Sequence, residues 1–187
     1  MSEARFPLPP EAAMSEAQRN LAKKIASGPR KTIRGPFIPL LRSPEMGDRV
    51  QQLGLYFRFE TKLPPALKEL AILVTARHWG AQFEWSVHRG FAVASGVAPE
   101  ICDAIARDEM PKNLSAEQQL VYDYARALLK EKGVADALFA RAMRMLGDER
   151  VVDLTICVGY YGMIGLLLNT DRTPVLPGEA TLPPLNG

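Results

Sequence analysis

The sequence predicts an all-α fold, and three observations point to it. Residues that start or end helices recur along most of the chain. Pro, Gly and capping residues separate apolar stretches whose lengths are typical of helices. No segment shows the period-two alternation, bounded by hairpin turns, that marks a half-buried strand. The 187 residues, 47% of them hydrophobic, are enough for one compact domain with a sizeable core.

The first 42 residues are rich in proline and are predicted to form an N-terminal arm, residues 1–42. One helix is expected in this arm, from about Pro10 to Ser27, because Gly28-Pro29 would end it there. The next stretch, KTIRGPFIPLLR, is predicted to be extended. An arm of this kind often lies over another part of the fold or over a neighbouring subunit.

Residues 43–175 are predicted to form a helical domain. Its first helix starts at Ser43-Pro44-Glu45, which reads as an N-cap, a first-turn proline and a first-turn acid, and runs to about Glu60. Pro64-Pro65 opens a second helix that ends near Gly80.

The remaining helices of this domain are expected at about 81–95, 99–107, 116–132, 135–146 and 148–169. Ser115 and Gln118 form a capping box before the third of them, and Gly133 is expected to end it. Further prolines then exclude helix, which leaves a Pro-rich C-terminal tail, residues 176–187.

Charge and composition exclude several classes of function. The 23 Lys and Arg residues nearly balance the 21 Asp and Glu residues, and they are scattered, so nucleic acid is not an expected partner. The one basic cluster, Arg30, Lys31 and Arg34, lies in a Gly/Pro-rich segment and is interpreted as a solvated connector.

The apolar segments and the cysteines indicate a cytoplasmic protein with no membrane partner. The N-terminus has no apolar signal core, so export is not expected. The longest apolar run, Leu154 to Leu168, is too short to span a bilayer and contains three glycines, so it is predicted to be a buried helix. Cys102 and Cys157 show no C-x-x-C spacing and are expected to be buried, reduced thiols.

The stretch GAQFEWSVHRG carries the candidate chemistry. In a helix, Ala81, Glu84 and His88 share one face, and the carboxylate can reach the imidazole one turn later. The acid would orient the ring and raise its pKa, giving a proton donor poised near neutral pH. Glu69 lies in the apolar run LKELAILV, and a hairpin at Gly80 would bring it beside this pair. Two carboxylates and an imidazole in an apolar crevice outline a proton-transfer site.

Other interpretations of these residues remain open. A Glu/His pair at this spacing is also an ordinary surface ion pair, and Phe83 and Trp85 suit a core as well as a pocket wall. His78 suits a helix C-terminus. A metal site is not predicted, because the chain has two histidines and no array at ligand spacing. The glycines Gly159, Gly162 and Gly165 favour close helix approach rather than dinucleotide binding, and Tyr160 and Tyr161 favour core or subunit contacts.

The block LPPALKELAILVTARHWGAQFEWSVHRGFAVASGVAPEICDAI resembles the core of the carboxymuconolactone decarboxylase family, which includes the AhpD-like alkylhydroperoxidases. The later stretch DERVVDLTICVGYYGMIGLLLNTDRTP is similar to the closing helix of its longer members, so that the resemblance covers roughly residues 35–175. It implies an all-α AhpD-like helical bundle that assembles into a homo-oligomer, either a trimer or a hexamer. It also implies a small-molecule substrate, no cofactor, and a role in aromatic compound catabolism or, at family level, peroxiredoxin activity.

The family has two branches, which differ in whether they carry a pair of cysteines. Its AhpD-like members carry a C-x-x-C on the motif helix, and the matching positions here are Ala81 and Glu84. Glu69 and His88 match the family's glutamate and histidine. Because a thiol peroxidase needs an attacking and a resolving thiol, the resemblance favours the branch without cysteines. Cys102 lies too far past the motif to substitute.

The resemblance therefore implies a cofactor-free carboxy-lyase that acts on a small lactone carboxylic acid. His88 would polarise the lactone oxygen or supply a proton, Glu84 would orient it, and Glu69 would carry a second proton if burial raised its pKa. The expected substrate contacts are an apolar wall and a carboxylate-binding arginine, from Phe83, Trp85, Phe91, Arg77 and Arg89. The alternatives are an AhpD-like alkylhydroperoxidase and a non-catalytic oligomeric protein that binds a small ligand.

Overall fold

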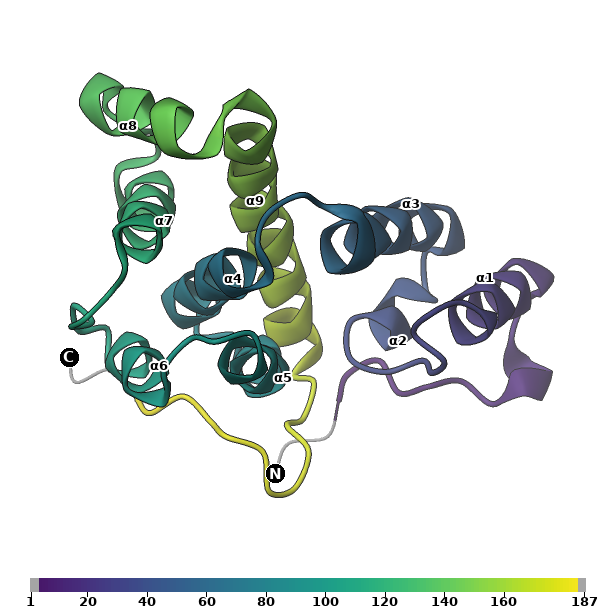
Figure 1. Cartoon of the computed structure of the whole chain (residues 1–187). Helices are drawn as coiled ribbons and strands as arrows, with labels where there is room; N and C mark the ends of the chain where they lie inside the picture. Colours follow the sequence, from purple (N-terminus) through teal and green to yellow (C-terminus); the bar gives the residue numbers. More distant parts are fainter. Residues whose placement is uncertain (1–3, 185–187) are drawn as a thin grey trace. The chain divides into compact units, whose positions relative to one another are not determined.

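A computed structural model describes residues 4–184, and all of its regular elements there are helices, which confirms the predicted fold class (Figure 1). The chain forms two compact units. One contains the described residues up to Thr61 together with Leu167–Pro174, and the other contains Lys62–Leu166 together with the described residues from Val175 onward. The ends of the predicted arm and tail, residues 1–3 and 185–187, lie outside the described residues.

The first unit begins with a short 3-10 helix and three α-helices. Its elements are η1 (Glu11–Ala13), α1 (Glu16–Ser27), α2 (Phe37–Leu40), α3 (Pro44–Leu55) and the π-helix η2 (Tyr56–Glu60). The single helix predicted from Pro10 is wrong at its start. Ser15 is a true N-cap, because its Oγ accepts from the Gln18 amide and its own amide donates to the Gln18 side chain, so α1 begins only after this capping box.

The predicted extended stretch before α3 is also wrong in part, because α2 interrupts it. Gly35 takes a left-handed conformation with φ of +56°, which turns the chain into the helix. Pro36 and Pro39 are tolerated because the first turn of a helix needs no intrahelical amide donors. Proline in this stretch therefore starts a turn of helix instead of excluding one.

Glycine 47 allows α3 to approach α1 and α2 closely. A Cβ atom at this position would lie 2.8 Å from Leu21 Cδ2 and 2.8 Å from the carbonyl oxygen of Leu40. Both contacts are too short for any side chain, so only glycine permits this packing.

The start of the N-terminal arm is tied to the end of the long last helix. The Arg5 amide donates to the Asp171 carbonyl oxygen at 2.7 Å, and the Phe6 amide donates to Asp171 Oδ1 at 2.7 Å. Asp171 is only 1% exposed, and the bond from the Phe6 amide gives its buried carboxylate a donor. The arm thus contacts its own chain, which is one of the two placements the sequence suggested.

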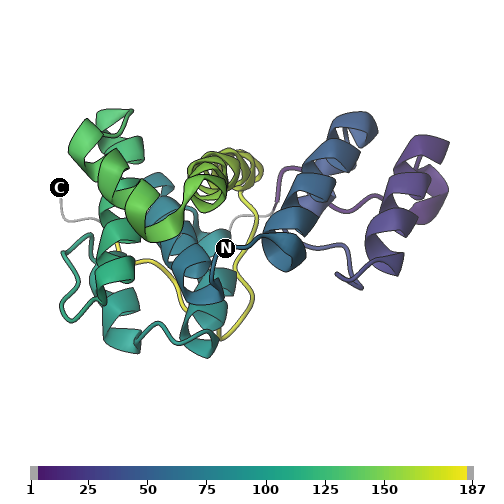
Figure 2. The same ribbon diagram turned by 45° about the horizontal axis from the view of Figure 1, so that its top comes forward.

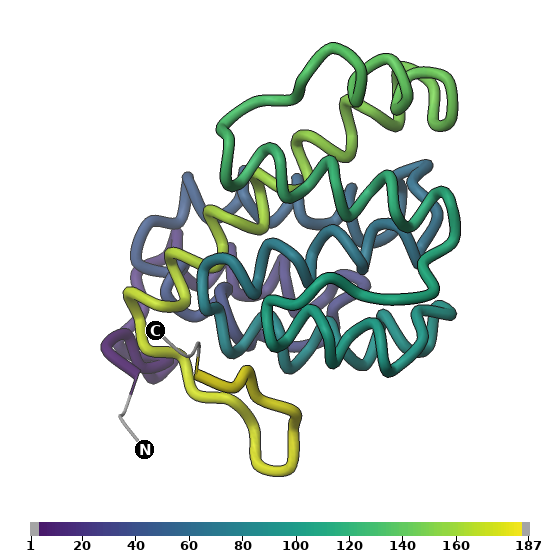
Figure 3. Tube along the Cα trace, turned by 90° about the vertical axis from the view of Figure 1, so that its left-hand side faces the viewer, coloured from purple at the N-terminus to yellow at the C-terminus, as the bar shows by residue number. Residues whose placement is uncertain are grey.

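The second unit is built around a helix that is buried on all sides. Its elements are α4 (Pro65–Trp79), α5 (Gln82–Ala94), α6 (Pro99–Ala106), α7 (Ala116–Arg126), the π-helix η3 (Ala127–Glu131), α8 (Asp136–Leu146) and most of α9 (Asp148–Asp171). Every residue from Leu67 to Arg77 of α4 is buried, because α5, α6 and α7 pack against it. These helices run side by side, and α9 crosses them obliquely (Figures 2 and 3).

The helix boundaries of this unit follow the sequence closely. Gly80 ends α4 with φ of +58°, and Ser115 and Gln118 form the predicted capping box of α7. The expectation that Gly133 ends the following stretch is wrong by one residue. The wider turn of η3 stops at Glu131, and Lys132 takes the left-handed position with φ of +61°.

Two of the three glycines on α9 allow the close helix approach that was predicted. A Cβ atom on Gly162 would lie 3.0 Å from Trp79 Nε1, and one on Gly165 would lie 3.1 Å from the Cβ atom of Ala81. Gly159 instead faces open space. The close contacts hold α9 against the turn between α4 and α5.

Helix α9 is longer than the apolar run suggested. Its 24 residues, with a mean hydropathy of 1.8 in the most apolar window, are long and apolar enough to cross a membrane by length and composition alone. The core helix of a globular unit meets the same criteria, and 61% of that window is buried. The large hydrophobic side chains of α9 that remain exposed are Val152, Ile156, Met163 and Leu166.

The C-terminal tail lies along α5 without forming a helix up to residue 184. Gln82 pairs with the backbone of Leu182, with bonds of 3.0 Å and 2.8 Å, and Ser86 Oγ donates to Glu179 at 2.6 Å. These bonds attach the tail to the face of α5 away from Glu84 and His88, since residues two apart in a helix lie about 160° from each other.

Candidate proton-transfer site

The hairpin of α4 and α5 brings together the three residues singled out for chemistry. His88 Nδ1 lies 2.6 Å from Glu69 Oε2, and His88 Nε2 lies 3.0 Å from Glu84 Oε2. Glu69 comes from α4, whereas Glu84 and His88 lie one turn apart on α5. The imidazole is therefore held at both nitrogens by carboxylates from two different helices.

This cluster is buried and its charges are nearly balanced. The side chains of Glu69, Glu84 and His88 are only 7–8% exposed. Lys68, whose side chain is 9% exposed, places Nζ 3.5 Å from Glu69 Oε1. With the ring protonated, two carboxylates face two cations, which is the arrangement that buried charges require.

The carboxylates raise the pKa of His88 to about 9, although burial alone would lower it. The ring is thus a cation at neutral pH, and not a group poised near neutrality as the sequence suggested. Burial raises the pKa of Glu69. The hydrogen bond and charge of His88, together with the charge of Lys68, outweigh this effect and hold the pKa of Glu69 below its ordinary value. The expectation that burial would make Glu69 a proton carrier is wrong, because its cationic partners keep it ionised.

Aromatic rings cover the imidazole. Tyr161 meets it edge-on with ring centroids 4.9 Å apart, and Phe91 does so at 5.8 Å. Burial, with the negative charges nearby, raises the pKa of Tyr161 well above its ordinary value, so its phenol stays neutral. The sequence placed Tyr161 in the core but not beside His88, and nothing local to α9 shows this contact. Lys68 was also missed, although a lysine next to Glu69 in an apolar run was a signal for it.

The proposed substrate contacts lie at different distances from this cluster. Of the apolar group, Phe91 touches His88, whereas Phe83 and Trp85 are core side chains only 6% and 1% exposed. Arg89 pairs with Asp103 at 2.9 Å, and Arg77 donates to the carbonyl oxygen of Pro183 at 2.8 Å. The structure thus directs both arginines to partners outside the Glu69–His88–Glu84 cluster. For Arg77 the reason is its position on α4, about two turns beyond Glu69.

The thiols do not resemble those of a peroxidase. The family's two cysteine positions hold Ala81, which is 1% exposed, and the paired Glu84. Cys102 and Cys157 are free and fully buried, as predicted. Burial raises the pKa of Cys102 to about 11 and raises that of Cys157 further, so neither is a thiolate at neutral pH.

Solved structures with the same fold are AhpD-like proteins. An uncharacterised peroxidase-related protein from Ralstonia eutropha JMP134 with an alkylhydroperoxidase AhpD core matches over 95% of this chain and 94% of its own, with a TM-score of 0.76 and 17% identity. A protein of unknown function from Agrobacterium tumefaciens, provisionally described as an antioxidant defence protein AhpD, matches over 73% of this chain and 94% of its own, with a TM-score of 0.63 and 21% identity. No protein-family model matches the chain, and no curated protein matches it in sequence. The chain therefore has the AhpD-like helical fold.

Proposed function

We propose that this protein is a cofactor-free carboxy-lyase that decarboxylates a small lactone carboxylic acid, of the carboxymuconolactone type. One observation carries the proposal: a buried, protonated His88 is clamped between Glu69 and Glu84, and the position of a peroxidase cysteine is occupied by one of these carboxylates. A buried imidazolium supplies both the positive charge and the proton that such a reaction needs.

The proposed reaction balances without a cofactor. The bond between the substrate carbon and its carboxylate breaks, carbon dioxide leaves, and the electron pair moves into the conjugated lactone as an enolate. His88 stabilises the enolate oxygen and then delivers its proton to carbon. A proton from solvent restores the imidazolium, so that one carboxylate and one proton become one carbon dioxide and one C–H bond.

We infer different roles for the two carboxylates from the lengths of the two hydrogen bonds of His88. The bond from Nδ1 to Glu69 is the shorter, at 2.6 Å, so Glu69 fixes the ring and maintains its charge. The bond from Nε2 to Glu84 is longer, at 3.0 Å, and in the proposed reaction it is the one that the substrate displaces. Glu84 is thus the exchangeable partner that holds Nε2–H until the lactone replaces it.

An AhpD-like alkylhydroperoxidase is the second candidate, and the names of the two structural neighbours favour it. It conflicts with the buried, protonated state of both thiols and with Ala81 and Glu84 at the cysteine positions. Thiol-dependent turnover of an organic hydroperoxide by the purified protein would establish this activity and remove the basis of the lyase proposal. A non-catalytic binding protein is the third candidate, and it predicts no turnover in either assay.

We also propose that the protein works in the cytoplasm as a homo-oligomer, a trimer or a hexamer. The exposed apolar residues Val152, Ile156, Met163 and Leu166 recur on α9 at spacings of four, seven and three, which form one stripe suited to a second copy. Sedimentation velocity tests this, and a monomer at micromolar concentration would contradict it.

The deciding experiment is a steady-state decarboxylation assay on a muconolactone carboxylate. We expect His88→Asn and Glu84→Gln each to lower kcat by about 100-fold or more, because general acid catalysis contributes on that scale. His78→Asn is the matched control and should retain activity, because His78 lies outside the cluster. Far-ultraviolet circular dichroism verifies that each variant is folded. Full activity in both cluster variants would end the assignment.

A further inference from the structure

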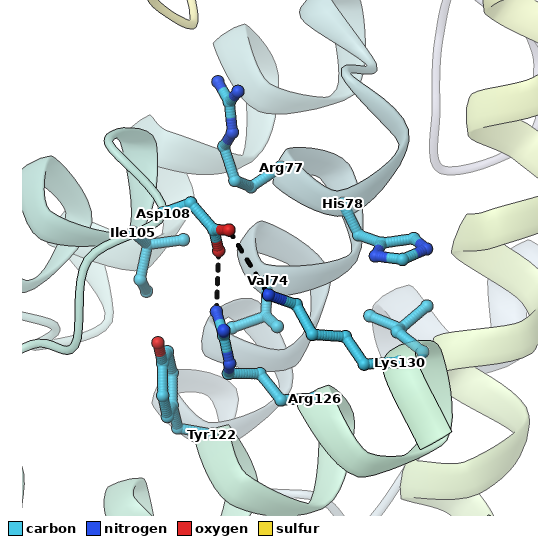
Figure 4. A pocket seen from close by; sticks show the side chains of 9 residues that line it. Val74, Arg77, His78, Ile105, Asp108, Tyr122, Arg126 and Lys130 are labelled. Carbon is cyan, nitrogen blue, oxygen red and sulfur yellow. Dashed lines mark hydrogen bonds and ion pairs between the residues drawn. The ribbon is translucent and has the colours of Figure 1, made fainter. Parts of the chain in front are cut away.

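A second cluster of charged residues surrounds a cavity at the other end of α4. The cavity, of about 90 Å³, lies between the end of α4, the segment after α6, and α7 with η3 (Figure 4). Its lining contains none of Glu69, Glu84 and His88, and consists of Val74, Arg77, His78, Ile105, Asp108, Tyr122, Arg126, Leu129 and Lys130. Arg77 follows Glu69 by eight residues, about 12 Å along the helix axis.

Positive charge exceeds negative charge in this lining. Asp108 is its one carboxylate, and it is shared by two cations, with Arg126 Nη1 at 2.6 Å and Lys130 Nζ at 3.3 Å. Figure 4 shows both side chains directed at this carboxylate. Arg77 is the third cation of the lining, and its guanidinium is directed away from Asp108, toward the carbonyl oxygen of Pro183 (Figure 4). With His78 neutral, the lining therefore carries a formal charge of +2.

Arg77 is an under-satisfied buried cation. The residue is 6% exposed, its Nη1 donates to the carbonyl oxygen of Pro183, and its Nε has no hydrogen-bond partner among residues 4–184. Burial lowers its pKa, and the charge of Asp108 opposes this effect. A buried guanidinium whose nearest anion already serves two other cations favours the arrival of a second anion.

The pKa of His78 responds to the same charged groups. His78 is an exposed residue whose ring is partly desolvated; this desolvation lowers its pKa, and the charges of Lys130 and Arg126 lower it further, against the opposing charge of Asp108. The ring is therefore neutral at pH 7. An anion bound in the cavity would offset the cations and raise this pKa, which makes His78 a built-in probe.

The rest of the lining is apolar. Val74, Ile105, Leu129 and the ring of Tyr122 make up this apolar part of the lining. A cavity of this size has room for several water molecules, and therefore for a ligand of a few non-hydrogen atoms. An inorganic phosphate would present oxygens to the apolar wall, where they find no donors. A carboxylate would instead present two oxygens to the cations and a short tail to the wall.

We propose that this cavity is a binding site for a small carboxylate with a short apolar tail, held by Arg126, Lys130 and the charge of Arg77. The bound carboxylate takes over part of the role of Asp108 as their counter-ion. This site is separate from the proposed lyase site, and it stands whether or not the protein proves to be a lyase.

The test is a histidine NMR titration of the full chain, in which only two imidazoles have to be resolved. The pKa of His78 is measured with propionate, with inorganic phosphate and with chloride, at constant ionic strength. We expect propionate to raise it saturably by half a unit or more, and chloride to leave it within about 0.1 unit. A larger effect from phosphate than from propionate, or an equal effect from all three anions, would overturn the proposal.

Two variants with opposite expected signs separate binding from structural damage. Lys130→Gln should weaken propionate binding at least threefold. Asp108→Asn should strengthen it at least threefold, because it removes the competing carboxylate, and asparagine tolerates the φ of +55° at this position. The control is Lys23→Gln, an exposed charge on α1 outside the lining. Equal binding by all of these proteins would show a non-specific salt effect and contradict the site.

Discussion

The two histidines of this chain lie on the two helices of one helical hairpin, and their pKa values are shifted in opposite directions. His88 faces two carboxylates, and its pKa rises to about 9. His78 faces Lys130 and Arg126, and its pKa falls below the ordinary value. Loss of contact with water lowers the pKa of both rings; at His78 it is the main cause of the shift, whereas at His88 the two carboxylates reverse it.

The two sites therefore differ in how completely their buried charges are paired. Around His88 the charges are paired within the cluster, and the ring is a permanent cation at neutral pH. Around His78 the cations outnumber the single carboxylate of the lining, which leaves attraction for an anion from outside. The first arrangement suits proton delivery and the second suits ligand capture.

The largest effect that tests this contrast is the loss of each ring. His88→Leu leaves Glu69 and Glu84 buried without their shared cation, and we expect the free energy of unfolding in urea to fall by roughly 3–5 kcal/mol. The matched variant His78→Leu breaks no ion pair and should stay within about 0.5 kcal/mol of the parent protein. Similar losses in both variants would show that the two sites do not differ as described.

The next effect is the dependence of stability on pH. The folded pKa of His88, about 9, exceeds its ordinary value of 6.5, so its contribution is fully present below pH 6.5 and is lost as the pH rises through about 9. The loss is roughly 3 kcal/mol, since one pKa unit corresponds to about 1.4 kcal/mol.

Urea unfolding between pH 6 and 10 measures this loss, and the slope should be smaller in His88→Asn. Glu69 acts in the opposite direction. Its lowered pKa gives stability that is present above pH 4.5 and lost in acid, so the cluster contributes most between about pH 4.5 and 6.5. A parent protein as stable at pH 10 as at pH 6 would contradict the paired imidazolium.

The smallest effect is a change in the pKa of His78 when one neighbouring charge is removed. Lys130→Gln removes one of the charges that lower its pKa, so this pKa should rise by a few tenths of a unit without added anion. The histidine NMR titration measures this rise, and His88 in the same spectrum serves as the internal control. A lower His78 pKa in the variant would exclude Lys130 as a source of the field.

Much of the fold was predictable from the sequence because residues that start or end a helix mark the boundaries of most helices. Pro65 and Gly80 bound α4, and the capping box before α7 appears as written. The wrong helix boundaries lie where these start and end signals are ambiguous. The sequence predicts a longer helix that includes Ser15, and it predicts an extended chain where α2 forms, although Pro36 and Pro39 are compatible with the first turn of that helix.

The Glu69–His88–Glu84 contact was predictable because it needs only one helix turn and one hairpin. The direction of Arg77 was not, because rotation around a helix that is buried on all sides has no apolar or polar stripe to mark it. The second cavity was equally hidden. Arg77, Asp108 and Arg126 come from α4, the segment after α6, and α7, and only tertiary packing brings them together.

The burial of both thiols has a practical consequence for experiments on this protein. Cys102 and Cys157 are 0% exposed, and the raised pKa of each keeps it protonated at neutral pH, so maleimide reagents should find no reactive native site. One cysteine introduced on an exposed helix face would then accept a fluorophore or spin label uniquely. With one such cysteine introduced on each of the two compact units, the distance between two labels could be measured without first removing any native residue.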